Sequence, residues 1–335
     1  MTTVGIPRAL LYYQYYPMWK AFFEHMGAKV VVTSPTTRKT LAEGAARVVA
    51  DTCLPVKVFV GHTVSLVGHC DCIFIPAVRS LKSKSYNCSK FLGLPDMTRA
   101  VVPEAPPILE IEIDINQGKR QLYRDIYSLG RYFAWNPLRV REAAMAAWQS
   151  FLDYRRLMQH RGLTPPQAME EITGEPQART DILPDSSRVP RTTIGLIGHA
   201  YLLYDKHINY QLISRLQQYD AAVLTPEMLP RHAVEASVNK LSGGAYWTYE
   251  EEVVGAGGHF LENSTDGIIG IMAFGCGPDS LMMDMVHRHA NRQKTTPFMC
   301  LTLEEHTSET GVITRLEAFM DMIHRRQQKS EVICV

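Results

Sequence analysis

The sequence predicts an α/β protein with two lobes, each built on a parallel sheet, and a helical connector between them. Strands alternate with helices in the first third of the chain, only helical periodicity follows, and a second alternating series then begins. A length of 335 residues also suits two domains. We expect an N-terminal lobe over residues 1–120, a helical connector and linker over 121–190, and a C-terminal lobe over 191–335.

In the first lobe, short β-branched runs predict strands and longer segments of helical apolar period predict helices. Pro7 should end the first strand, and Pro17 should interrupt or restart the helix after it. The expected strands are 4–6, 28–33 and 72–76, and the expected helices are 9–26, 36–50 and 56–68.

The connector should hold two helices and a polar linker, and the second lobe then repeats the alternation. The expected connector helices are 122–133 and 140–158, with the linker over 180–191. In the second lobe the expected strands are 193–197, 221–225, 267–273 and 297–303, and the expected helices are 209–218, 280–293 and 311–325. Because ligands of open α/β sheets bind beyond the carboxyl ends of the strands, we expect the lobes to enclose a site between them.

Charge and hydropathy exclude several classes of partner. The formal charge is +1, so no broad field is available for nucleic acid or an anionic membrane. No uninterrupted apolar run has the ~18 residues of a membrane-spanning helix. The first residues lack the basic, apolar and small-residue regions of a secretion signal. We therefore expect a cytoplasmic protein that binds neither nucleic acid nor a membrane.

Cysteines are the most informative residues of the chain. There are seven, and an odd number in a large cytoplasmic chain argues against a disulfide framework. Metal ligation, catalysis and simple burial are the remaining roles. Cys53, Cys88 and Cys276 each lie outside the end of a predicted strand, and we interpret these three as cofactor and metal ligands.

Cys276 carries the strongest argument of the three. It stands between a buried strand and a helix, with a glycine on either side that lets the backbone approach a bulky group. The N-terminus of the following helix favours negative charge there. Cys53 precedes Pro55, which suits a first helical turn, whereas Cys88 lies in a loop. Taken singly, Cys53 or Cys88 would fit a small buried hydrophobe.

The other cysteines are expected to have structural roles. Cys70 and Cys72 form a Cys-x-Cys pair on one face of a strand, where packing is the first interpretation and metal binding the alternative. We expect Cys300 in the core and Cys334 in a polar C-terminal tail.

A zinc ion and an iron–sulfur cluster are the two kinds of metal site that could use three distant cysteines. Structural zinc sites usually take close pairs such as Cys-x₂-Cys, and the sequence has no such pair. Thiolates gathered from distant parts of a fold suit an iron–sulfur cluster. Three thiolates favour one [4Fe-4S] cluster with an open iron, while a double-cubane cluster would need six, from Cys70, Cys72 or a second chain.

Further polar residues follow other predicted strands. His306, with Glu305 or Glu309, could form an acid–base pair, and a solvated helix cap is the alternative. His199 offers a second candidate catalytic histidine. The basic residues near Cys88 could bind an anionic substrate, neutralise an anionic cluster or form a solvated loop; they are Arg79, Lys82, Lys84 and Lys90. No Gly-x₄-Gly-Lys-Ser/Thr phosphate loop is present.

Several motifs resemble the activase-related proteins of the 2-hydroxyacyl-CoA dehydratase and benzoyl-CoA reductase superfamily. These motifs span both predicted lobes. The residues that carry the resemblance include Gly5-Ile6-Pro7-Arg8, Cys53-Leu54-Pro55-Val56-Lys57, Gly61-His62, Cys88-Ser89-Lys90, Phe274-Gly275-Cys276-Gly277-Pro278 and Leu301-Thr302-Leu303-Glu304-Glu305-His306. The sequence departs from the expected pattern at Ser89, where we expect proline, and at Glu304, where we expect aspartate.

The resemblance implies two flavodoxin-like or Rossmann-like lobes that hold an iron–sulfur cluster, with Cys53, Cys88 and Cys276 at the ligand positions. It also implies a separate ATP-dependent activase as electron donor. The function expected first is a reductase component that passes low-potential electrons to a small-molecule substrate. A non-catalytic electron-transfer or cluster-carrier protein and an acyl-CoA dehydratase subunit are the alternatives. A homodimer is left open.

Overall fold

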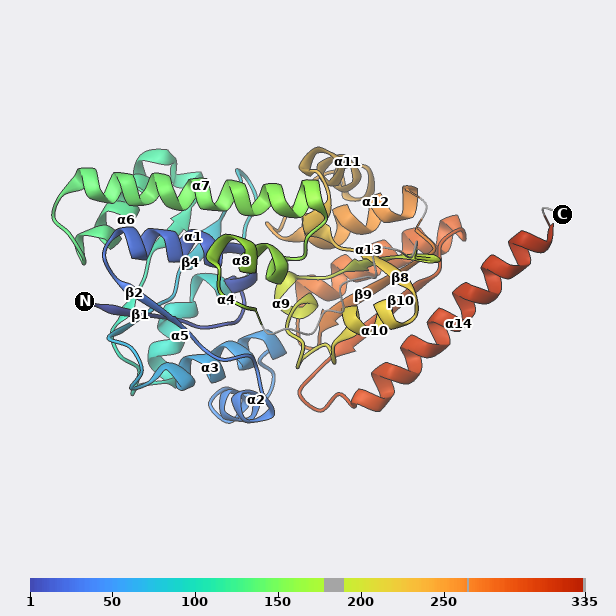
Figure 1. The fold of residues 1–335 in the computed structure, drawn as a ribbon, viewed down its shortest axis with the longest axis horizontal. Helices are drawn as coiled ribbons and strands as arrows, with labels where there is room; N and C mark the ends of the chain where they lie inside the picture. The colour runs from blue at the N-terminus through green and yellow to red at the C-terminus, as the bar shows by residue number, and fades with distance from the viewer. Residues whose placement is uncertain (178–189, 264, 334–335) are drawn as a thin grey trace. The chain divides into compact units, whose positions relative to one another are not determined.

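The computed structural model describes residues 1–177, 190–263 and 265–333, and the chain forms two compact units. Unit 1 comprises Met1–Gln177 together with Ala245–Tyr249, and unit 2 comprises Ala178–Gly244 and Glu250–Val335. Figure 1 shows strands and helices alternating in both. The predicted linker over 180–191 lies almost entirely outside the described residues, and the domain boundaries at 120 and 190 stay predictions.

Unit 1 is built on a parallel four-stranded sheet in the order β2-β1-β3-β5. A second, two-stranded parallel sheet pairs β4 with β6. Strand β1 lies at the centre, with Val4 opposite both Val30 and Cys72. The strands are β1 (Thr3–Ile6), β2 (Lys29–Val32), β3 (Cys72–Phe74), β4 (Ala77–Ser80), β5 (Ile108–Leu109) and β6 (Glu112–Asp114).

The helices of unit 1 include those predicted for the connector, and α6, α7 and α8 pack within this unit. They are α1 (Tyr12–His25), α2 (Arg38–Ala45), α3 (Leu54–Leu66), α4 (Ser89–Leu92), α5 (Leu94–Val101), η1 (Ile115–Gln117), α6 (Lys119–Arg131), α7 (Pro137–Arg161) and α8 (Pro165–Thr173). Among the described helices of the chain, none combines the length and apolar composition needed to span a bilayer.

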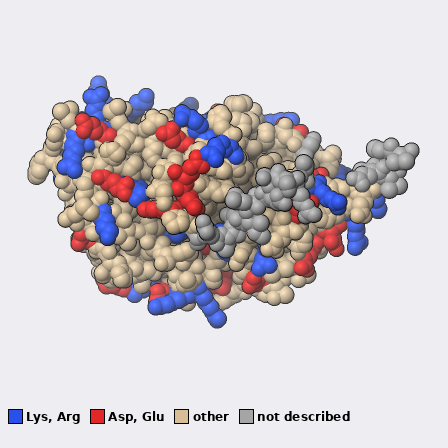
Figure 2. Space-filling view, viewed as in Figure 1, with Lys and Arg blue, Asp and Glu red and all other residues tan. Residues whose placement is uncertain are grey.

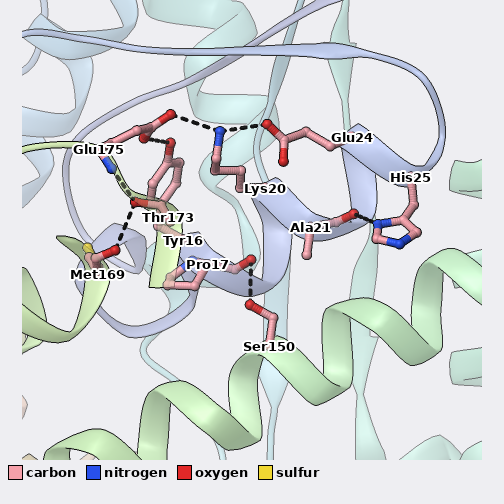
Figure 3. A network of polar contacts seen from close by, with 10 residues as sticks. All are labelled: Tyr16, Pro17, Lys20, Ala21, Glu24, His25, Ser150, Met169, Thr173 and Glu175. Atoms are coloured by element: carbon pink, nitrogen blue, oxygen red, sulfur yellow. Dashed lines mark hydrogen bonds and ion pairs between the residues drawn. The ribbon is translucent and has the colours of Figure 1, made fainter. Parts of the chain in front are cut away.

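Helix α1 corrects the expectation that Pro17 interrupts it, because the helix runs unbroken through this residue. Proline has no N–H, so the carbonyl four residues earlier, that of Tyr13, loses its usual helical donor. The hydroxyl of Tyr154, from α7, donates to that carbonyl at 2.6 Å. The Ser150 hydroxyl donates to the Pro17 carbonyl at 3.2 Å (Figure 3). Helix α7 thus supplies the donor that proline removes.

Glu175, just beyond the C-terminus of α8, connects the end of that helix to α1 by hydrogen bonds (Figure 3). It accepts hydrogen bonds from the Tyr16 hydroxyl at 2.7 Å and from Lys20 Nζ at 2.8 Å. Lys20 also pairs with Glu24 one turn away, at 2.6 Å. Burial opposes ionisation of Glu175, but the hydrogen bonds from Lys20 and Tyr16 outweigh it and hold the pKa of this carboxyl below its usual value of 4.5.

We expect Glu175→Gln to lower the free energy of unfolding by about 1 kcal/mol at pH 7, because it weakens two charge-assisted hydrogen bonds at a half-exposed site. A depressed pKa stabilises the fold above pH 4.5, and this contribution is lost as the pH falls below that value. Urea unfolding should therefore show a smaller difference from the parent at pH 3.5. Glu24→Gln, which removes only the pairing within α1, is the matched control and should cost less than about 0.5 kcal/mol. Equal effects of the two variants would contradict this role.

Unit 2 repeats the architecture with a parallel sheet in the order β10-β9-β7-β8. Its strands are β7 (Thr192–Ile197), β8 (Ala221–Leu224), β9 (Gly267–Ala273) and β10 (Phe298–Leu303). Its helices are α9 (Ala200–Leu203), α10 (Leu212–Gln218), η2 (Pro226–Met228), α11 (Arg231–Ser242), the π-helix η3 (Glu251–Gly255), α12 (Ala256–Glu262), α13 (Gly277–Gln293) and α14 (Glu309–Ile333). Helices η3, α12 and α13 share an apolar core with β9.

Both sheets place their first strand between the second and the third, which is the flavodoxin-like order. The predicted α/β fold class with parallel sheets is confirmed. In such a sheet the chain reverses its winding between the first and third strands, and ligands bind beyond the carboxyl ends at that point. This point lies between β1 and β3 in unit 1, and between β7 and β9 in unit 2. Figure 2 shows charges of both signs interspersed over the viewed face, in keeping with the formal charge of +1.

Candidate functional site

Cys53 occupies the N-cap of α3, the helix that connects β2 to β3. Its backbone is extended, with φ −62° and ψ 147°, and its partly buried side chain does not cap the helix by a hydrogen bond. Pro55 occupies the first turn, as predicted. Lys57, one turn further on, is buried and donates from Nζ to the Ala50 carbonyl at 2.8 Å. A thiol and an ammonium group thus stand one helical turn apart at the start of α3.

Two features fix α3 in place. Its His62 is fully buried between the hydroxyls of Thr33 and Thr36, at 2.7 and 2.8 Å. Burial, with the nearby charge of Arg8, lowers the pKa of His62 to about 3, so the ring is neutral at pH 7. A Cβ added at Gly61 would lie 1.9 Å from the Thr40 carbonyl oxygen of α2, so only glycine allows this approach. His62 and Gly61 therefore have structural roles.

Cys88 occupies the equivalent N-cap position of α4, beyond the end of β4. Its backbone is again extended, with φ −53° and ψ 141°, and its side chain makes no capping hydrogen bond. It is partly buried. The sequence predicted a loop position for this residue, and the structure adds the short helix that begins directly after it.

The segment Ala245–Tyr249 holds the loop that carries Cys88. The Tyr86 N–H donates to the Tyr246 carbonyl at 3.0 Å, and the Thr248 N–H donates to the Tyr86 carbonyl at 2.9 Å. The Tyr249 ring lies 5.8 Å from the Phe91 ring of α4. The next residue along the chain, Glu250, already belongs to unit 2. A segment that comes late in the sequence thus belongs to unit 1 and packs around its second candidate ligand.

Cys276 is the N-cap of α13, directly after β9 in unit 2. Gly275 has φ +78°, which favours glycine, and Pro278 lies in the first turn. A Cβ added at Gly277 would meet nothing within 4 Å, so space is open beside the thiol. The side chain of Cys276 is partly buried and makes no capping hydrogen bond.

The three candidate ligands therefore share one structural position. Helix N-caps usually carry serine, threonine, aspartate or asparagine, whose oxygens accept from the first turn. Here cysteines occupy three such positions, all with extended backbone and none capping its helix. Within the described parts of the chain, no three histidine, cysteine, aspartate or glutamate side chains form a group arranged to hold a metal ion. Cys53 and Cys88 lie in unit 1 and Cys276 in unit 2, so their union as one ligand set stays a prediction.

A cluster of buried charges lies at the carboxyl edge of the sheet of unit 2. His199, the N-cap of α9, follows β7 and pairs through Nδ1 with Glu252 at 3.1 Å and through Nε2 with Asp279 at 2.6 Å. Burial opposes protonation of His199, but Asp279 and Glu252 outweigh it and raise the pKa to about 10. Asp279 belongs to the first turn of α13, three residues after Cys276. The protonated imidazole thus holds the helix that begins at Cys276.

A third acid, Glu227, joins this cluster from beyond the end of β8. Glu227 is buried in η2 and accepts a hydrogen bond from the Tyr204 hydroxyl at 2.6 Å. Burial, together with the negative charge of Glu252, raises the pKa of Glu227 to about 7. Sequence reasoning singled out His199 but missed Glu227, Glu252 and Asp279. Glu227 and Asp279 stand shortly after predicted strands, and that position was the signal available for them.

The comparison with protein families bears on both units. Residues 3–229 match the family described as the CoA enzyme activase uncharacterised domain (DUF2229). The chain belongs to this family. The matched range includes Cys53, Cys88, His199 and Glu227, and it ends before Cys276. No curated protein matches the chain.

Membership in the CoA enzyme activase domain family places the protein on the activase side of the predicted superfamily, and the family description ties the domain to activation of CoA enzymes. The predicted role as a reductase component is more specific than this family description, and it stays a prediction. The iron–sulfur cluster and the activase partner likewise stay predictions for this family member.

The predicted acid–base pair near His306 lies beyond β10 in unit 2. Glu304 and Thr307 close a turn, in which the Glu304 N–H donates to Thr307 Oγ1 at 2.8 Å. His306 is exposed in this turn, and Glu305 is partly buried. Glu309 pairs instead with Arg215, at 2.6 Å. The catalytic roles assigned to His306, Glu305 and His199 stay predictions.

The basic residues near Cys88 differ in their surroundings. Arg79 lies 3.5 Å from Glu112 and 3.7 Å from Asp114, both on β6. Lys84 and Lys90 are exposed. The backbone N–H of Lys84 donates to Asn116 Oδ1 at 2.9 Å. Arg79 is exposed as well, but it lies beside two carboxylates, so Lys84 and Lys90 are the exposed lysines of this basic loop.

The remaining cysteines include one correction. Cys300 was expected in the core, but it is exposed, because β10 is the edge strand of its sheet. Burial raises the pKa of Cys70, and it raises the pKa of Cys72 to about 12. Both thiols therefore stay protonated at neutral pH, which fits packing rather than metal binding. Cys334 lies outside the described residues.

Proposed function

We propose that this protein is an iron–sulfur electron-transfer component in the activation of a CoA-dependent enzyme, with Cys53, Cys88 and Cys276 as cluster ligands. The observation that carries the proposal is the shared position of these cysteines, each at the N-cap of a helix and none making a capping hydrogen bond to it. The family description supports the link to CoA-enzyme activation.

The chemistry of these residues fits such a cluster. Thiolates are the usual protein ligands of iron–sulfur clusters, and a helix N-terminus favours the negative charge of a thiolate and its cluster. The open space at Gly277 and the buried ammonium of Lys57 add room beside one ligand and positive charge near another. When bound, the cluster would supply single electrons at low potential. Three ligands per chain favour one [4Fe-4S] cluster, and the protonated Cys70 and Cys72 do not extend the set.

The electron donor we propose is a separate ATP-dependent activase, and the acceptor is either a CoA enzyme or a small-molecule substrate. The buried position of His199 favours electron transfer over catalysis in this chain. Both of its ring nitrogens are held by carboxylates, so it has no nitrogen left to protonate a substrate. A reductase acting on its own substrate would depend on the exposed His306 and on Glu305.

Anaerobic purification with iron and acid-labile sulfide analysis tests the proposal. We expect about four iron and four sulfide per chain, and a paramagnetic signal after reduction by an activase with ATP. About eight of each would indicate a double-cubane cluster. A protein without iron after anaerobic purification and attempted reconstitution would refute the proposal. ATP turnover that rises only when a small substrate is added would identify a reductase instead of a carrier.

Lys84 provides a test of where the activase docks. Charged residues at the rim of an interface mainly govern the association rate and its dependence on salt. We expect Lys84→Glu to slow activase-dependent reduction by roughly tenfold at low ionic strength, with the difference shrinking as salt is added. Stopped-flow reduction, with dithionite as a second reductant, provides the measurement.

The matched control is Lys29→Glu, at the opposite, amino-terminal end of the sheet on β2. It should reduce at the parental rate with either reductant. If Lys84→Glu slows reduction by dithionite as much as reduction by the activase, the lysine serves the cluster and not the docking surface.

A further inference from the structure

Helix α7 has apolar residues on two opposite sides. Its inner side is buried, with Tyr154 bonded to α1, and comprises Val140, Ala143, Ala147, Tyr154 and Met158. A helix at the surface of a globular protein normally has a single apolar stripe, which faces the core, and a polar opposite face. The outer side of α7 departs from this rule.

The outer side carries four exposed apolar residues in a line, which we call the outer stripe: Leu138, Met145, Trp148 and Leu152. Their spacings of seven, three and four residues keep them within an arc of about 80°, at about 100° per residue. The exposed fractions of Met145 and Trp148 are 61% and 56%, so most of the surface of these two side chains is open to solvent among the described residues. Spacings of three, four and seven are typical of a seam between two packed helices.

Aromatic residues extend the apolar surface at the N-terminal end of α7. Tyr123 and Tyr132 are exposed in and just after α6, and Trp135 is 76% exposed in the turn that joins the two helices. The guanidinium group of Arg131 lies over the Trp135 ring, 4.3 Å from its centroid. Tryptophan, tyrosine, methionine and arginine are the residue types enriched in the cores of protein interfaces.

The same two helices are strongly basic. From Lys119 to Arg161 there are nine lysines and arginines against three aspartates and glutamates, whereas the whole chain has a formal charge of +1. Several of the arginines pair with no acidic side chain among residues 1–177, 190–263 and 265–333; they are Arg120, Arg124, Arg141 and Arg155. Arg141 and Arg155 stand seven residues before and after Trp148, so they lie along the Trp148 side of the outer stripe. We call these arginines the positively charged rim of the stripe.

We propose that the outer stripe of α7 binds an amphipathic helix with acidic flanks on a partner protein. An apolar seam buries its residues against a second helix, and the rim selects a partner of opposite charge. A second copy of this chain would bring two basic rims together, which is unfavourable. A membrane surface is also less suited, because interfacial helices insert a broad apolar face, whereas this stripe is narrow. The proposal is independent of the cluster and of its ligands.

Two synthetic peptides test this surface on the full-length protein. Both are three-heptad helices with leucine at the a and d positions, one with glutamate and one with lysine at e and g. By titration calorimetry, we expect the glutamate peptide to bind at least about tenfold more tightly than the lysine peptide, and to weaken as salt is added. Equal binding of both peptides, or of neither, would overturn the proposal.

Paired variants localise the binding. Met145→Asp, in the outer stripe, should lower the affinity for the glutamate peptide by at least about tenfold. Met322→Asp, at an exposed methionine of α14, is the matched control and should bind like the parent. Both variants should unfold at the parental temperature and contain the parental amount of iron. Sedimentation that reveals a dimer abolished by Met145→Asp, or vesicle binding abolished by it, would assign the face to a second copy or to a membrane and overturn the proposal.

Discussion

Replacing Cys276 by alanine should remove nearly all bound iron from the anaerobically purified protein. Cys276 is the ligand that we propose for unit 2, and the open space at Gly277 beside it offers no other sulfur donor from the same turn. Cys53→Ala and Cys88→Ala should have the same effect, because a cubane held by three thiolates loses a corner with any one of them. Iron and sulfide analysis, with visible absorbance, measures the outcome.

The control for this prediction is Cys300→Ala. Cys300 is an exposed cysteine of unit 2, on the edge strand β10, and its loss should leave the iron content at the parental level. Circular dichroism should be unchanged in all four variants, so that loss of iron is separated from loss of fold. Full iron content in Cys276→Ala would remove this residue from the ligand set, and with it the proposed single site.

The second large effect is expected at His199. Its protonated ring is buried between the partly buried Glu252 and the buried Asp279, and Glu227 adds a third acid that is also buried. His199→Gln removes the only positive charge of this cluster and leaves buried carboxylates without compensation. Breaking a buried ion pair in this way typically costs about 3–5 kcal/mol. We expect a loss of this size in the free energy of unfolding, measured with urea at pH 7.

The pH dependence of this effect has a defined sign. A histidine whose pKa is raised from 6.5 to about 10 on folding stabilises the fold fully below pH 6.5, and this contribution is lost as the pH rises through 10. The difference between parent and His199→Gln should therefore shrink between pH 7 and pH 10. His306→Gln, at an exposed histidine of the same unit, is the matched control and should be neutral throughout. A constant difference across this range would mean that His199 acts through packing and not through its charge.

The extent to which this fold follows from sequence depends on how completely each strand is buried. Strand β9 matches its predicted range, Gly267–Ala273, because a central parallel strand forms a continuous apolar run. The pair β4 and β6 was missed, since its short strands include the polar residues Arg79, Glu112 and Asp114. The unbroken helix at Pro17 could not be predicted either. It depends on Tyr154, which is far away in the sequence and becomes a neighbour only after folding.

The candidate site divides in the same way. Local sequence around Cys53 and Cys276, with a proline in the next turn, was enough to place both near helix N-termini. The burial of these charges could not be predicted from the sequence, because the residues around Glu227 and Asp279 have the same local pattern as a solvent-exposed helix N-cap. Only the tertiary structure brings Asp279 to His199 and gives the latter a protonated ring.

The path of the chain at Ala245–Tyr249 has a practical consequence for anyone who divides this protein. The chain leaves unit 1 at Gln177, returns to it for five residues, and leaves again. A fragment that stops at Gln177 therefore lacks the backbone partner of Tyr86 and the ring that packs on Phe91. A truncation designed from a two-domain diagram would release an N-terminal half with its Cys88 loop unsupported. Supplying the missing stretch in trans, or splicing it onto the fragment by a short linker, is the way to recover that half as an independent folding unit.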